Sequence, residues 1–230
     1  GRPSFKLTDL TAANGLVHEA AHDALSDVRA TIALARLIKT RQPRLWEFCL
    51  RLRSKHEVLR EMASAQEQGK PFLHISGMYG TERGCTALVW PSAPHPSNKN
   101  EVIVWDLSVD PSELFTLNVD DIRTRMFTRT ADLPEGVTRL PIKTLHINKS
   151  PIVIGNLKTL SPEMAAKWGL DIPLALRHAE LVAQKAHLLA GMWPAVFERP
   201  AREAPTDVDE DLYGGFIGND DRRSLQRLRT

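Results

Sequence analysis

The sequence has little cysteine and no long apolar run, and each absence excludes a class of protein. Its two cysteines, Cys49 and Cys85, lie far apart and match neither a metal-ligand nor a redox spacing. We interpret them as buried thiols in a reducing compartment. No stretch approaches the roughly 18 apolar residues of a membrane span, and nothing resembles a secretory signal. We therefore expect a cytoplasmic protein with no membrane partner.

The sequence also lacks a strong net charge. Its formal net charge is +2, so the overall balance does not by itself indicate a nucleic-acid partner. The 230 residues are 42% hydrophobic and 25% charged, which is ordinary for one large or two small globular cores. Residues 29–60 are locally rich in Lys and Arg, with only Glu47 and Glu57 as acids. That run fits either a solvated helix face or a surface that contacts phosphates.

The most informative stretch is residues 20–31, where His22 precedes Asp27 by five positions. Apolar residues at three- and four-residue spacing predict an amphipathic helix that begins here: Leu25, Val28, Ile32 and Ala35. A carboxylate can ligate Mg²⁺ and a histidine can take a proton from water, and phosphodiester hydrolysis needs both. By itself the pattern also fits a helix-start histidine followed by capping or solvated aspartates.

A resemblance extends this interpretation. Residues 22–28 resemble the last motif of the DEDDh 3′→5′ exonucleases, with His22 and Asp27 at its two marked positions. Further segments resemble the bacterial exonuclease I family in the same order along the chain: residues 10–15, 39–44, 74–80, 146–151 and 212–216. The resemblance implies a parent that removes nucleoside 5′-monophosphates from the 3′ end of single-stranded DNA, in repair and recombination. It implies Mg²⁺ as cofactor, with Mn²⁺ as the alternative, Asp27 as a metal ligand and His22 as general base.

The pattern of elements predicts an α+β fold. Helical periodicity covers residues 24–40 and 44–65, and strand-like segments follow at 72–76, 85–90, 102–107, 140–147 and 152–154. Ser161-Pro162 begins a helix, and further helices are expected at 173–189 and 220–230. The resemblance implies that residues 1–43 end an RNase H-like exonuclease domain. It also implies an SH3-like β-barrel with inserted and flanking helices at 44–199, then a linker and the start of a helical domain at 200–230.

One feature of the family is missing. A two-metal site needs several carboxylates, and the family takes the others from an Asp-x-Glu pair and a middle Asp. No Asp-x-Glu occurs in this sequence. We therefore expect a fragment of a monomeric parent, inactive alone. The alternative is a non-catalytic module that binds single-stranded DNA or a protein tail.

Candidate DNA-binding residues lie in two glycine- or turn-rich segments. Tyr79 and Arg83 could stack on a base and contact phosphate, and His146, Asn148 and Lys149 form a polar cluster after a strand. The alternatives are a half-buried turn aromatic for Tyr79, loop hydrogen bonds for His146 and Asn148, and a solvated Lys149. We interpret five isolated histidines as structural: His18, His56, His95, His178 and His187.

The resemblance also implies a protein partner, the acidic C-terminal tail of single-stranded-DNA-binding protein. Phe48 and Lys70 match elements of the docking surface by position. Residues 155–161 differ in spacing by one residue, and Ser161 stands where a basic residue is expected. Docking is therefore expected to be weaker or shifted.

Overall fold

The computed structural model describes residues 3–18, 23–198 and 217–228. His22, the linker and the 212–216 segment lie outside these residues. The chain divides into two units, residues 1–197 and 198–230. In the second unit, helix α9 spans Asn219–Leu228. Within the described part of the chain, no helix is long and apolar enough to cross a membrane. The predicted boundaries at residues 43 and 199 stay predictions.

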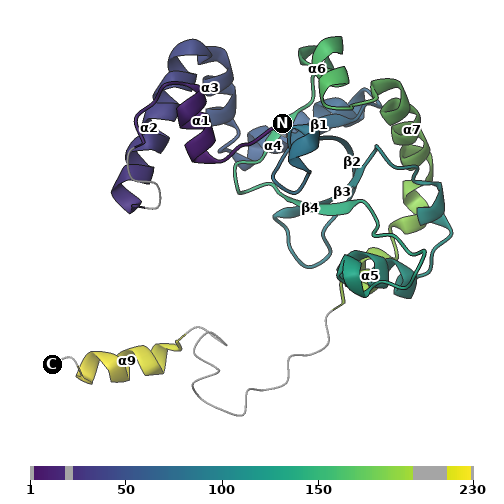
Figure 1. Ribbon diagram of the computed structural model, residues 1–230. Helices are drawn as coiled ribbons and strands as arrows, with labels where there is room; N and C mark the ends of the chain where they lie inside the picture. The colour runs from purple at the N-terminus through teal and green to yellow at the C-terminus, as the bar shows by residue number, and fades with distance from the viewer. Residues whose placement is uncertain (1–2, 19–22, 199–216, 229–230) are drawn as a thin grey trace. The chain divides into compact units, whose positions relative to one another are not determined.

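Four helices open the first unit (Figure 1): α1 (Leu7–Ala13), α2 (Ala24–Arg41), α3 (Pro43–Arg51) and α4 (Lys55–Glu67). The single helix predicted over 44–65 is wrong, because the structure breaks it between α3 and α4. The amides of Leu52, Arg53 and Ser54 bond back to nearby carbonyls in a tight turn. The break lets Leu52 lie fully buried in the same cluster as Val58 and Met62 of α4.

A five-stranded antiparallel sheet follows, with the order β4-β3-β2-β1-β5. Its strands are β1 (Phe72–Ile75), β2 (Thr86–Pro94), β3 (Glu101–Asp106), β4 (Ile142–His146) and β5 (Ile152–Ile154). Strand β2 runs further than predicted, to Pro94, with an irregular register between Pro91 and Ala93. Proline lacks an amide donor, which explains why the ladder is interrupted there.

The sheet has a hydrophobic core on each face. Alternate residues of β2 point to opposite sides: Trp90 belongs to one cluster and Val89 to the other. The first cluster includes Trp105 and is covered by α7 (Ile172–Leu189), and the second is covered by α4. Figure 1 shows α4 and α7 beside the sheet. The mixed helical and antiparallel architecture confirms the α+β prediction.

Short helices complete this unit: η1 (Thr81–Arg83), η2 (Ser112–Phe115), α5 (Val119–Phe127), η3 (Thr130–Asp132), η4 (Leu157–Thr159), α6 (Pro162–Lys167) and α8 (Trp193–Val196). Ser161 caps α6 as predicted, since its hydroxyl accepts the amide of Met164 at 3.2 Å.

Candidate functional site

Asp27 lies in the first turn of α2. Asp23 caps this helix, because its carboxylate accepts the amide of Ser26 at 2.9 Å. The Asp27 side chain is 42% exposed. Three residues of the predicted apolar stripe are about half exposed: Leu25, Val28 and Ile32. His22, the expected general base, lies outside the described residues.

His18 contacts Asp27, and the sequence interpretation missed this contact. His18 Nε2 lies 2.7 Å from Asp27 Oδ1, and the His18 side chain is 5% exposed. The chain reaches this position because α1 ends in a Schellman turn, in which the amide of Leu16 bonds to the carbonyl of Thr11. Gly15 has φ of +63°, which that turn requires. In the sequence, Asn14-Gly15 shortly before the motif indicates this helix end.

The carboxylate of Asp27 can serve as one ligand of a hard divalent cation. A carboxylate oxygen is the donor that Mg²⁺ prefers, and the partial exposure leaves Asp27 accessible to solvent. Among the residues that the structure describes, no group of three His, Cys, Asp or Glu side chains is arranged to hold a metal ion. These residues alone therefore do not form a complete metal site.

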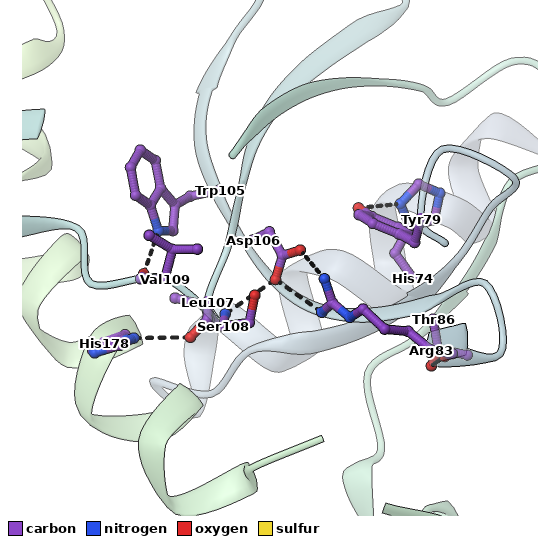
Figure 2. A network of polar contacts seen from close by, with 10 residues as sticks. All are labelled: His74, Tyr79, Arg83, Thr86, Trp105, Asp106, Leu107, Ser108, Val109 and His178. Atoms are coloured by element: carbon purple, nitrogen blue, oxygen red, sulfur yellow. Dashed lines mark hydrogen bonds and ion pairs between the residues drawn. The ribbon is translucent and has the colours of Figure 1, made fainter. Parts of the chain in front are cut away.

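Arg83 and Asp106 form a bidentate ion pair between η1 and the end of β3 (Figure 2). Arg83 Nη1 lies 2.7 Å from Asp106 Oδ2, and Nη2 lies 3.2 Å from Oδ1. Asp106 is 6% exposed and also accepts the amide of Ser108 at 3.0 Å. The guanidinium predicted to contact phosphate is thus held by a buried carboxylate.

Tyr79 packs in the core beside this pair and not on an open surface. The residue is 4% exposed, and its hydroxyl lies 3.1 Å from His74 Nδ1 (Figure 2). Burial lowers the pKa of His74 to about 4 and raises the pKa of Tyr79 above its usual value. His74 is therefore neutral near pH 7, and its Nδ1 shares a hydrogen bond with the Tyr79 hydroxyl. This geometry matches the turn-aromatic alternative, and a DNA contact by Tyr79 stays a prediction.

The buried His74 makes stability depend on pH. Its pKa is about 4 when folded and 6.5 when unfolded, so the unfolded state takes up the proton first as the pH falls. We expect the free energy of unfolding to drop by about 3 kcal/mol between pH 7 and pH 4 through this group. Urea denaturation across that range measures it. His74→Gln should remove this part of the pH dependence, while His56→Gln, at an exposed histidine, should retain it. Equal pH dependence in the wild type and His74→Gln would contradict the assignment.

The three candidates His146, Asn148 and Lys149 lie at the end of β4 and in the turn after it, where the amide of Lys149 bonds to the carbonyl of His146 at 3.4 Å. Asn148 and Lys149 are exposed, and His146 is partly exposed beside them. His146 Nδ1 lies 3.5 Å from Glu101 Oε1, across the β3–β4 pair. Glu101 is a partner that the sequence analysis missed, because nothing local links it to His146.

A groove next to α4 contains Lys70 but not Phe48. Its volume is about 560 Å³, and its lining includes Arg60, Lys70, Lys158, Leu157, Ile172 and Leu176. Phe48 instead packs against the α4-side core, with Arg51 over its ring. Ser161 is not part of the lining, whereas Lys158 supplies a cation. Gly155 closes one side, where a Cβ would lie 2.5 Å from the Glu61 carbonyl oxygen.

Comparison with known proteins agrees with this architecture. A family model described as the exonuclease I SH3-like domain matches residues 53–199, which confirms the SH3-like prediction. Exodeoxyribonuclease I of Escherichia coli (strain K12) is 40% identical over 227 residues, covering 98% of this chain and 47% of that protein. The Haemophilus influenzae exodeoxyribonuclease I is 38% identical over 231 residues, covering 100% and 48%.

Two solved structures are similar throughout this chain. The crystal structure of E. coli exonuclease I with a dA16 oligonucleotide has a TM-score of 0.84 at 40% identity, covering 100% of this chain and 48% of that one. A moderately thermophilic exonuclease I from Methylocaldum szegediense has a TM-score of 0.82 at 40% identity, covering 100% and 46%. The chain thus spans about half the length of the relatives it matches.

Proposed function

The chain belongs to the exonuclease I family, and from this premise we propose that the whole protein degrades single-stranded DNA from its 3′ end, releasing nucleoside 5′-monophosphates. The observation that carries the proposal is the 40% identity to an exodeoxyribonuclease over 98% of this chain. Solved relatives described as complexes with DNA oligonucleotides support single-stranded DNA as the substrate. Roles in DNA repair and recombination, a cytoplasmic location and a monomeric whole protein belong to the same proposal.

We assign Asp27 as one ligand of a catalytic divalent cation and His22 as the base that takes the proton from the attacking water. Mg²⁺ is the proposed ion and Mn²⁺ the alternative. A relative described as a zinc-bound exonuclease I–DNA complex supports metal binding in the family. The bound ion would supply positive charge at the scissile phosphate. With only one such carboxylate in this motif, we expect residues 1–230 alone to be inactive.

The test is release of nucleotides from single-stranded DNA by the full-length protein in the presence of Mg²⁺. DNA labelled at its 3′ end should lose label at once, while 5′-labelled DNA should shorten stepwise. Release that begins at the 5′ end would overturn the proposed polarity. DNA binding without release would favour the non-catalytic binding module.

We place the DNA-contacting surface of the sheet domain at His146, Asn148 and Lys149. His146 ends β4, and the exposed Asn148 and Lys149 follow it directly, an arrangement that suits contact with a phosphodiester backbone. Arg83 and Tyr79 remain candidates of lower weight, because an ion pair and burial already account for them.

The proposed protein partner is the acidic C-terminal tail of single-stranded-DNA-binding protein, docked in the groove beside α4. The groove is lined by apolar side chains and by the cations Arg60, Lys70 and Lys158, with Glu61 as the one acid in its lining, and this excess of positive charge suits a peptide that ends in a carboxylate. Phe48 was predicted to take part and does not line this groove.

Lys70→Ala should weaken binding of a synthetic tail peptide by about five- to tenfold, because one charge-assisted contact is removed. Fluorescence anisotropy at two salt concentrations measures the change, which should shrink at high salt. Lys99→Ala removes an exposed lysine outside the groove and serves as the matched control. Equal affinities for Lys70→Ala and Lys99→Ala would remove Lys70 from the docking surface.

A further inference from the structure

His18 makes a direct contact with the carboxylate assigned to the metal. The Nε2 atom of His18 and Oδ1 of Asp27 are 2.7 Å apart, although His18 lies in the α1–α2 connection and Asp27 lies nine residues later in α2. An ionised carboxylate can only accept hydrogen bonds, so the proton of this contact is on Nε2. His18 therefore donates to Asp27 and fixes one of its two oxygens.

The ring of His18 is itself held in place. Its side chain is only 5% exposed, and its Nδ1 lies 3.4 Å from the hydroxyl of Thr11. Thr11 is 1% exposed, and its hydroxyl is also 2.9 Å from the carbonyl oxygens of Leu7 and Thr8. A line of polar contacts thus runs from the backbone of α1 through Thr11 and His18 to Asp27.

We propose that His18 is a positioning residue for Asp27: it sets the orientation of this carboxylate toward a divalent cation, with Thr11 holding the ring. The inference rests on the proposed function, because it takes Asp27 as a metal ligand. A hydrogen bond to one carboxylate oxygen restricts rotation about the last side-chain bond and reduces the entropy lost on ion binding. Residues that orient metal ligands in this way typically contribute about ten- to a hundredfold to metal affinity.

The experiment measures Mn²⁺ binding to the full-length protein by titration calorimetry, without DNA and without turnover. His18→Ala should weaken Mn²⁺ binding by about tenfold or more and raise the Mn²⁺ concentration for half-maximal nucleotide release. The KM for DNA should stay within about twofold of wild type. His18→Gln keeps a donor at the position of Nε2 and should restore Mn²⁺ affinity to within about threefold. His178→Gln is the matched control, because His178 Nδ1 donates to the Leu107 carbonyl at 2.8 Å and does not contact Asp27.

The outcomes separate this inference from the proposed function. A wild-type protein that releases no nucleotides would defeat the proposed function, whatever the variants do. If the wild type is active and His18→Ala binds Mn²⁺ with unchanged affinity, the positioning role is overturned. Should His18→Ala fail to fold, His18→Asn replaces it, because the shorter amide is polar but cannot reach Asp27. Equal Mn²⁺ affinity of the Asn and Gln variants would then overturn the role.

Discussion

Replacing Asp27 with asparagine in the full-length protein should lower nucleotide release from single-stranded DNA by at least about a thousandfold. The substitution removes the negative charge of a proposed metal ligand, and a thousandfold loss corresponds to about 4 kcal/mol in the barrier. The fold should not change, because Asn retains an acceptor oxygen that His18 can bond. Initial rates on 3′-labelled DNA at saturating Mg²⁺ measure the effect, with thermal denaturation to check folding.

The adjacent turn offers a matched control for that prediction. Asp23→Asn also removes a carboxylate charge near the start of α2, but asparagine caps a helix as well as aspartate does. Its rate should stay within about threefold of the wild type. A rate for Asp27→Asn close to that of Asp23→Asn would contradict metal ligation by Asp27 and with it the assigned mechanism.

Local sequence signals predicted the elements well, because caps, turns and periodicity act over a few residues. Ser161 caps α6 as expected. The strand predicted at residues 85–90 is part of β2, whose two faces meet different cores. The break at Leu52 was missed, because a continuous apolar stripe looks the same whether or not the helix is interrupted to bury that side chain.

The candidate site was predicted only as far as local motifs allow. Asp27 was recognised from its motif, whereas His18 was interpreted as structural, since its contact with Asp27 depends on the turn that ends α1. The pairing of Arg83 with Asp106 joins residues 23 positions apart, and no periodicity signals it. A tyrosine in a glycine-rich turn resembles a stacking residue, and only the tertiary structure shows that Tyr79 is buried.

The ion pair between Arg83 and Asp106 should be the most stabilising polar contact of the sheet domain. Arg83→Met should lower the free energy of unfolding by about 3 kcal/mol, because it leaves the Asp106 carboxylate buried without its cation. This value is at the low end for buried pairs, since the Arg83 side chain is 26% exposed. Arg60→Met, which breaks an exposed pair with Glu57, is the control and should cost less than about 1 kcal/mol. Guanidinium denaturation measures both.

A double substitution tests the physical reason for this expected loss. If the loss comes from a stranded charge, Arg83→Met combined with Asp106→Leu should recover most of the stability, because no buried carboxylate remains. If Arg83→Met and the double variant are equally unstable, the loss comes from the packing of the arginine stem and not from the charge. The double variant also separates structure from DNA contact: it is expected to fold and to bind single-stranded DNA with unchanged affinity. Weakened binding in a folded double variant would instead restore Arg83 as a phosphate contact.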